Sequence, residues 1–263
     1  MNNWQGKVIV ITGASGGLGA RIALDAAERG ATPVLMARRM DQLENIQSEI
    51  KNKFQIDAWI YSLDVGNLVQ VKNVFEQLFT QVSHVDVLIN NAGFGIFEEF
   101  IQADINDIVT MFQTNVIGLM ACTKAVLPHM MIRDKGHIIN IASQAGKIAT
   151  PKSSGYTATK HAVLGFSNSL RMELSKTNIH VTTVNPGPIE TNFFSIADKS
   201  GNYVESVKRW LLSPELVSKK VITSIDKPVR EINLPFLMNI GSKIYRMMPG
   251  FIEKVAASAF NKK

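Results

Sequence analysis

A strand, a glycine-rich turn and a helix follow one another at the start of the chain, and this order constrains the fold more than any other feature. The β-branched run VIVI at 8–11 is typical of a strand that is buried on both faces. It leads into TGASGGLG at 12–19, and the apolar residues of 20–29 then recur at helical spacing until Gly30. Glycines let a backbone approach a ligand closely, and a helix N-terminus offers free N–H groups. The stretch therefore predicts a phosphate-binding turn, although its G-x-x-x-G-x-G spacing differs from the standard G-x-G-x-x-G fingerprint.

Strands and helices alternate across residues 7–191 without a linker or a low-complexity run. Such alternation is typical of a parallel, doubly wound sheet with helices on both faces, and a chain of 263 residues accommodates it as one large α/β domain. Ligands of such sheets bind beyond the C-terminal ends of the strands. After the first strand, strand-like runs occupy 33–37, 58–63, 85–89, 137–142 and 179–185, and helical runs occupy about 69–78, 104–130 and 156–175.

The end of the second predicted strand indicates which dinucleotide the turn would bind. Folds that bind NAD tend to place an acidic residue here for the ribose 2′-hydroxyl, whereas an arginine accommodates a 2′-phosphate. In this chain Ala37 is followed by Arg38 and Arg39. We therefore expect NADP(H), in preference to the alternative that the two arginines are merely solvated.

Tyr156 and Lys160 stand four residues apart and would share one face of a helix. A neighbouring positive charge lowers the pKa of a phenol, which is otherwise near 10. Such a tyrosine can give a proton to a carbonyl oxygen, or take one from an alcohol, near neutral pH. Two further residues fit such a site. Ser143 follows the strand-like run 137–142, and Asn115 interrupts a predicted helix in which asparagine is unfavourable, so a hydrogen bond that opens or bends that helix is expected.

Taken in order, these motifs closely resemble those of the short-chain dehydrogenase/reductase family. The resemblance covers the chain from Lys7 to Thr191, and its marks are TGASGGLG at 12–19, NNAG at 90–93, Ser143, YTATK at 156–160 and NPG at 185–187. It implies a Rossmann-type sheet of about seven strands, with the last strand near 231–234. It also implies a catalytic set that this chain has in full: Asn115, Ser143, Tyr156 and Lys160.

The resemblance assigns a role to each of these residues. Tyr156 would be the general acid and base, while Lys160 would lower its pKa and hold the nicotinamide ribose. Ser143 would bind the substrate oxygen, and Asn115 would keep a proton-relay water near Lys160. The implied cofactor contacts are Gly13, Ser15, Gly17, Leu18 and Gly19 at the pyrophosphate, Arg38 with Arg39 at the 2′-phosphate, Asp64 and Val65 at the adenine, Asn91, Ala92 and Gly93 along the cofactor, and Pro186, Gly187, Ile189 and Thr191 at the nicotinamide.

Neither metal nor thiol chemistry is indicated. The five histidines show no ligand spacing, and the single cysteine, Cys122, lies in an apolar helical run as a small buried hydrophobe would. One cysteine excludes an internal disulfide framework and suits a reducing compartment. We find no signal peptide and no run of about 18 apolar residues, so a cytoplasmic protein is expected.

The net charge of +6 is a property of the C-terminal quarter of the chain. Residues 199–263 carry 12 Lys and Arg against 5 Asp and Glu, whereas residues 1–198 carry 16 against 17. No nucleic-acid-binding motif accompanies this charge, so we expect no nucleic-acid partner. Residues 192–263 would form a substrate lid over 192–212 and then C-terminal amphipathic helices, whose apolar stripes are Phe236, Ile240, Ile244 and Met248 before Pro249-Gly250, and Phe251, Ile252, Val255, Ala256 and Phe260 after it.

Two interpretations of the basic amphipathic segment stand. In the one that we favour, it packs on the catalytic domain or on a second subunit. In the other, it rests on an anionic membrane surface or shelters a long apolar substrate. A lipophilic substrate is expected in either case, because five apolar side chains would line the crevice: Phe94, Ile96, Phe97, Phe193 and Phe194.

Together these features predict an NADPH-dependent oxidoreductase that reduces an apolar or long-chain ketone or aldehyde, with Tyr156 as general acid. The resemblance also implies a homodimer or homotetramer. Two alternatives stay open. One is an NADP-dependent alcohol dehydrogenase that runs in the oxidative direction, and the other is a regulatory NADP(H)-binding protein without turnover, against which the intact catalytic set argues.

Overall fold

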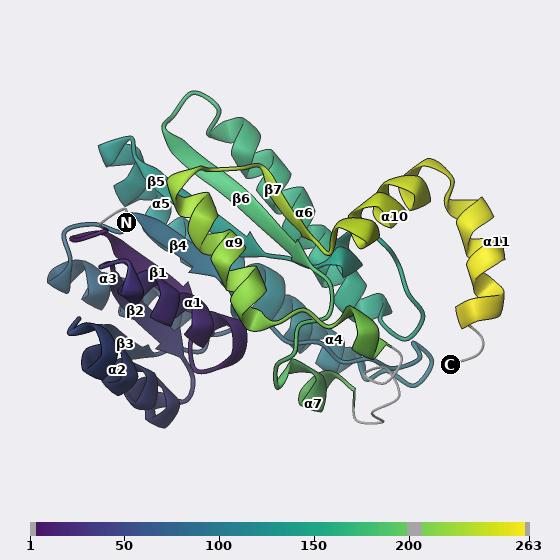
Figure 1. The fold of residues 1–263 in the computed structure, drawn as a ribbon, viewed down its shortest axis with the longest axis horizontal. Helices are drawn as coiled ribbons and strands as arrows, with labels where there is room; N and C mark the ends of the chain where they lie inside the picture. Colours follow the sequence, from purple (N-terminus) through teal and green to yellow (C-terminus); the bar gives the residue numbers. More distant parts are fainter. Residues whose placement is uncertain (1–3, 199–206, 261–263) are drawn as a thin grey trace.

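A seven-stranded parallel sheet forms the centre of the protein in the computed structural model, which describes residues 4–198 and 207–260 (Figure 1). The strand order is β3-β2-β1-β4-β5-β6-β7, so it reverses between β1 and β4. Ligands of such sheets bind in the crevice at this switch point. The predicted doubly wound, Rossmann-type fold is thus confirmed, with strands β1 (Val8–Thr12), β2 (Thr32–Ala37), β3 (Trp59–Ser62), β4 (Val87–Asn90), β5 (Gly136–Ile141), β6 (Ile179–Pro186) and β7 (Glu231–Leu234).

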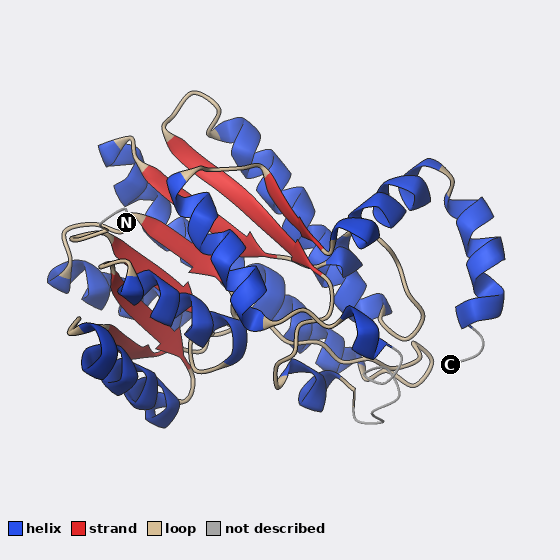
Figure 2. Cartoon of the chain, viewed as in Figure 1, coloured by secondary structure: helices blue, strands red, loops and turns tan. Residues whose placement is uncertain are grey.

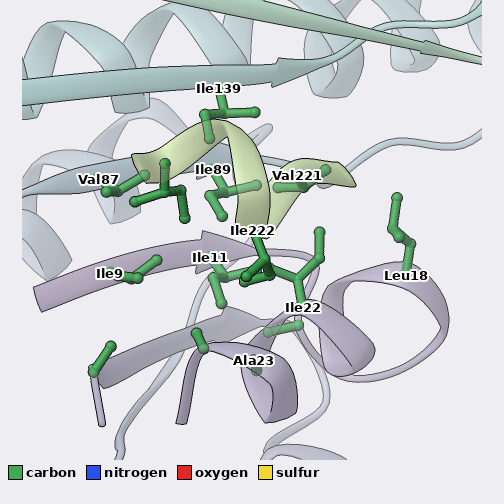
Figure 3. Packing of buried hydrophobic residues seen from close by; sticks show 14 of the residues in the cluster. Ile9, Ile11, Leu18, Ile22, Ala23, Val87, Ile89, Ile139, Val221 and Ile222 are labelled. Carbon is green, nitrogen blue, oxygen red and sulfur yellow. The ribbon is translucent and has the colours of Figure 1, made fainter. Parts of the chain in front are cut away.

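Helices cover both faces of the sheet (Figure 2). Helices α1 (Gly17–Glu28), α2 (Met40–Phe54) and α9 (Pro214–Asp226) pack on one face, and helices α3 (Leu68–Gln81), α5 (Leu119–Arg133) and α6 (Ser154–Glu173) pack on the other. Successive side chains of a strand point to opposite faces. Ile9 and Ile11 accordingly join the cluster of α1 and α9, as Figure 3 shows, while Val8 and Val10 join the cluster of α3 and α5.

One continuous helix runs through α4 (Ile105–Phe112), a π-helical turn (Gln113–Gly118) and α5. Asn115 lies in the π-helical turn, which confirms the expectation of a helix opened at this residue. By length and composition alone this helix could cross a membrane, although no run of about 18 apolar residues was expected from the sequence. It is a helix of the core, because α5 packs against α3, β4 and β5 and buries Cys122, Val126 and Met130.

The C-terminal part begins with α7 (Phe193–Ala197) and a short 3-10 turn (Lys208–Trp210). An isolated bridge between Ile189 and Leu212 closes the base of the predicted lid, of which 199–206 lies outside the described residues. Helices α10 (Phe236–Met247) and α11 (Pro249–Phe260) then extend away from the sheet as an arm (Figure 1). The break between the two helices falls at Met248, directly before the predicted Pro249-Gly250, which begins α11. The structure does not describe the side chains of three residues of the predicted stripe: Val255, Ala256 and Phe260.

Candidate active site

A cleft of about 1260 Å³ opens at the C-terminal ends of the strands. Its walls come from the glycine-rich turn, the ends of β2, β4, β5 and β6, and the helices α6, α7 and α10. The structure therefore brings together residues from most of the chain. The predicted site residues that line the cleft are Gly13, Ser15, Gly17, Leu18, Arg38, Arg39, Asp64, Val65, Asn91, Ala92, Gly93, Ser143, Tyr156, Lys160, Pro186, Gly187, Ile189 and Thr191.

The glycine-rich turn forms a cradle without side chains at one end of the cleft. Helix α1 begins at Gly17, and its N-cap Gly16 provides no side-chain cap, so the first N–H groups of the helix are left for a ligand. Gly13 has φ +66°, and a Cβ atom at this position would lie 2.8 Å from Ala92 Cα. A side chain would therefore not fit at Gly13.

Gly19 is the one predicted pyrophosphate contact that does not line the cleft. It lies behind the turn, where an added Cβ atom would stand 2.4 Å from the Gly13 carbonyl oxygen and 2.6 Å from Asn91 Nδ2. Asn91 in turn donates from Nδ2 to the carbonyl oxygens of Thr12 and Gly13, at 3.0 and 3.1 Å. Gly19 thus allows helix, turn and strand end to pack closely, and its contact with a pyrophosphate stays a prediction.

Two arginines stand at the end of β2, as predicted. Arg38 and Arg39 are exposed and line the cleft beside the turn. Arg39 Nη2 donates to Ser15 Oγ over 3.2 Å, which connects the arginine pair to the cradle. This end of the cleft therefore offers backbone N–H groups and two positive charges, a combination that suits phosphate groups.

Tyr156 and Lys160 lie on α6 and both line the cleft. Lys160 is buried, its Nζ donates to the Ile141 carbonyl oxygen over 2.9 Å, and the same Nζ lies 5.7 Å from the centre of the Tyr156 ring. Burial lowers the pKa of the Lys160 ammonium to about 8. The predicted pair is thus a desolvated cation beside a phenol, not a solvated helix face.

Ser143 follows β5 and caps a short 3-10 turn (Gln144–Gly146). Its Oγ accepts a hydrogen bond from the Ala145 N–H over 3.0 Å. The Pro186 carbonyl oxygen lies 3.5 Å away, at the outer limit for a hydrogen bond. The hydroxyl proton of Ser143 is therefore available to an oxygen atom within the cleft.

Asn115 does not line the cleft but supports it from behind. Its Oδ1 accepts from the Phe94 N–H at 3.0 Å, and its Nδ2 donates to the Phe94 carbonyl oxygen at 2.8 Å and to Thr159 Oγ1 at 3.1 Å. Thr159 Oγ1 donates in turn to the Tyr156 carbonyl oxygen over 2.7 Å. The side chain of Asn115 thus ties the loop after β4 to the helix that carries Tyr156 and Lys160, and the predicted water relay remains a prediction.

Aromatic side chains surround the Tyr156 ring. The ring centres of Phe97 and Phe193 lie 5.6 and 5.7 Å from that of Tyr156, and Phe194 packs against both phenylalanines. The Phe97 N–H donates to the Ala197 carbonyl oxygen over 2.8 Å, which holds α7 against the loop after β4. This confirms an apolar crevice with one exception, because the predicted Ile96 does not line it.

Several lining residues were absent from the predicted site, and three of them bear on its geometry. Gly16 belongs to the motif and could have been included. Met238 on α10 lines the cleft near Gly187, where an added Cβ atom would lie 2.9 Å from the Met238 sulfur. Lys152 precedes α6 with φ +63°, and its Nζ lies 3.6 Å from Glu99 Oε1. No sequence pattern marks Lys152, since its place depends on the turn.

The histidines and the cysteine have structural surroundings. His137 is buried with Nε2 2.8 Å from Thr182 Oγ1, and burial lowers its pKa to about 3. Burial raises the pKa of the Cys122 thiol to about 12. Within 4–198 and 207–260, no group of three or more His, Cys, Asp or Glu could hold a metal ion.

Comparisons with known proteins agree with this geometry. The family model described as short chain dehydrogenase matches residues 7–200. An "NADP-dependent 3-hydroxy acid dehydrogenase" of Schizosaccharomyces pombe is 40% identical over 195 residues, which are 73% of this chain and 75% of that protein. A solved serine dehydrogenase, in its closed form with NADP+, is 32% identical with a TM-score of 0.79, over 86% of this chain and 94% of that chain. An alcohol dehydrogenase of the archaeon Thermococcus sibiricus, complexed with 5-hydroxy-NADP, is 26% identical with a TM-score of 0.78, over 87% and 94%.

Proposed function

The chain belongs to the short-chain dehydrogenase/reductase family, and on that premise we propose that it uses NADPH to reduce the carbonyl group of an apolar ketone or aldehyde. The observation that carries the proposal is the buried Lys160 beside Tyr156, in a cleft whose other end is a glycine cradle with two arginines. The family supports an oxidoreductase that acts on CH–OH and C=O groups. NADP(H) as the cofactor is supported by the S. pombe relative and by the solved relatives with bound NADP.

The residues of the cleft fit such a cofactor. A side chain at Gly13 would collide with Ala92, so the cradle keeps backbone N–H groups open at the N-terminus of α1 for a pyrophosphate. Arg38 and Arg39 suit a 2′-phosphate. When bound, NADPH supplies the hydride that becomes the new C–H bond of the product.

Tyr156 would give its proton to the carbonyl oxygen, so that the alcohol forms and a phenolate is left behind. The positive charge of Lys160 stabilises that phenolate, since burial removes the water that would screen it. One of the three N–H donors of Lys160 binds the Ile141 carbonyl oxygen, which leaves two for groups in the cleft. Ser143 would donate its hydroxyl proton to the same substrate oxygen. In the oxidative direction Tyr156 would take the proton from the alcohol.

The substrate would be apolar around its carbonyl group. Phe97, Phe193 and Phe194 form the wall beside Tyr156 and offer no charged group there. Burial of each additional methylene against this wall would contribute about 0.8 kcal/mol, which is roughly a fourfold gain in kcat/KM.

The test is NADPH oxidation with methyl ketones and aldehydes graded by chain length, with NADH in parallel. We expect kcat/KM to rise with chain length and NADPH to be preferred. Phe193→Ser should flatten the dependence on chain length, whereas Met172→Ser, which changes an exposed apolar residue on α6, should not. A preference for NADH, or a rate independent of chain length, would contradict the proposal.

A second candidate is oxidation of a 3-hydroxy acid. The name of the S. pombe relative supports it, and Lys152 supplies a cation on the cleft wall that could bind a carboxylate. A 3-oxo acid and its methyl ester separate the two candidates. If the acid is the better substrate and Lys152→Gln removes that advantage, the hydroxy-acid function replaces the apolar one.

Three predictions beyond the reaction remain proposals. They are a cytoplasmic location, a homodimer or homotetramer, and a substrate lid at residues 192–212. Light scattering on the purified protein measures the second directly.

A further inference from the structure

Helix α10 turns its apolar face to solvent and its polar face to the body of the protein. With 3.6 residues per turn, its exposed apolar side chains fall within about 120° of arc. Phe236 is 70% exposed and Met247 is 82% exposed. The opposite side carries the buried Ser242 and also Asn239, which lines a cavity of about 400 Å³ beside β7. The exposed apolar residues of α10 and the residue that follows it are Phe236, Leu237, Ile240, Ile244, Met247 and Met248.

This orientation contradicts the favoured interpretation in one respect. The apolar stripe of α10 does not pack on the catalytic domain, at least within the part of the chain that the structure describes. Helix α10 contacts β7 and the turn Gln144–Gly146, and α11 continues the arm with Phe251 exposed. A contiguous exposed apolar surface on a folded protein marks an interaction site.

The charges on the arm identify the kind of surface that would cover it. Lys243, Arg246 and Lys254 are exposed, and among the described residues of the arm the one acid is Glu253, which accepts a hydrogen bond from Tyr245 over 2.9 Å. Lys243 and Arg246 line the cavity beside β7 together with one carboxylate, that of Glu231.

Glu231 is already engaged, because its Oε2 lies 2.5 Å from Lys147 Nζ. Lys243 and Arg246 form no ion pair within the described ranges. If a second copy of this chain packed its own arm against this arm, the cations of the two arms would face each other, which is unfavourable. An anionic lipid surface would instead take up the apolar face, and the long exposed side chains of Lys243 and Arg246, which flank that face on the cavity side, would reach its headgroups.

We propose that α10 docks the protein on an anionic lipid bilayer, with its exposed apolar face at the boundary between headgroups and acyl chains. Met238 of the same helix lines the active-site cleft. Docking would therefore bring this wall of the cleft close to the lipid, from which an apolar substrate could enter. This last consequence rests on the proposed function, whereas the docking itself does not.

The test is flotation of the full-length protein with vesicles of phosphatidylcholine alone and of phosphatidylcholine with 30% phosphatidylglycerol. We expect binding to the anionic vesicles at low salt and its loss at 0.5 M salt. Lys243→Gln with Arg246→Gln should weaken the partition about 30-fold, at about 1 kcal/mol for each cation. Leu237→Gln with Met247→Gln should weaken it at least about tenfold.

Ile132→Gln on α5 is the matched control, because Ile132 is 85% exposed and α5 lies away from the arm in Figure 1. Its binding should equal that of the unmodified protein. Failure of the unmodified protein to float with anionic vesicles at low salt would overturn the proposal. The double variant Leu237→Gln with Met247→Gln gives a second way to overturn it. If this variant has a lower oligomeric mass in light scattering but binds vesicles as before, the apolar face covers a second subunit and not a lipid surface. Turnover of a short, water-soluble carbonyl compound in the same variants reports on the proposed function separately.

Discussion

Replacing Lys160 by methionine should change how the stability of the protein depends on pH. Burial lowers the pKa of Lys160 from 10.5 to about 8, so the folded state disfavours the charged form. Below pH 8 the folded protein carries a buried charge, at a cost of about 3 kcal/mol. Between pH 8 and 10.5 the unfolded chain binds more protons than the folded one, and the free energy of unfolding rises with pH. At pH 9.5 the remaining cost is about 1 kcal/mol.

Urea denaturation of the unmodified protein and of Lys160→Met, at pH 7.0 and pH 9.5 and at one protein concentration, measures this effect. The variant also loses the hydrogen bond to the Ile141 carbonyl oxygen, but this loss is common to both pH values and cancels. From pH 7.0 to pH 9.5, the free energy of unfolding of the unmodified protein should rise by about 2 kcal/mol relative to that of Lys160→Met. Lys219→Met, which removes an exposed ammonium, is the control. An equal difference at both pH values would refute the buried charge on which the mechanism depends.

Other substitutions test the cofactor end and the supports of the cleft. Arg38→Ser with Arg39→Ser should raise the KM for NADPH about 10- to 100-fold through lost charge-assisted hydrogen bonds and leave the KM for NADH unchanged, as steady-state kinetics would show. Gly19→Ala should lower the free energy of unfolding by about 3 kcal/mol, because its Cβ would collide with the backbone, whereas Gly165→Ala in open space on α6 should raise it by up to about 1 kcal/mol. Asn115→Ala should cost about 2–4 kcal/mol in denaturant unfolding and also lower kcat, because the Phe94 backbone groups lose their partner; unchanged kcat would contradict its positioning role.

The sheet could be predicted from sequence because its strands are short β-branched runs that end in polar or glycine residues. Run 8–11 and strand β1, for example, differ by one residue. Strand β7 was located by family resemblance, since four residues carry little periodicity of their own. Helices α2 and α9 were not assigned, although Leu43 and Ile50 stand at helical spacing and Ser213 caps α9 ahead of Pro214.

Most of the site could also be predicted, because its motifs follow the strand ends that the topology brings together. A glycine pattern does not distinguish contact with a ligand from close packing of the backbone, so the sequence could not show that Gly19 lies behind the turn. Lys152 could not be found, because only the folded turn brings it to the cleft. For α10 the pattern predicted an apolar face, but not that this face would point away from the body.

The proposed mechanism requires Tyr156 as the proton donor, and Tyr156→Phe tests this requirement by removing only the hydroxyl group. Turnover of the best carbonyl substrate with NADPH should fall by about 10²- to 10⁴-fold, while fluorescence titration should show nearly unchanged NADPH binding. That result would place the phenol in the chemical step. Turnover within about tenfold of the unmodified protein would contradict the mechanism, even if the fold and the cofactor assignment stood.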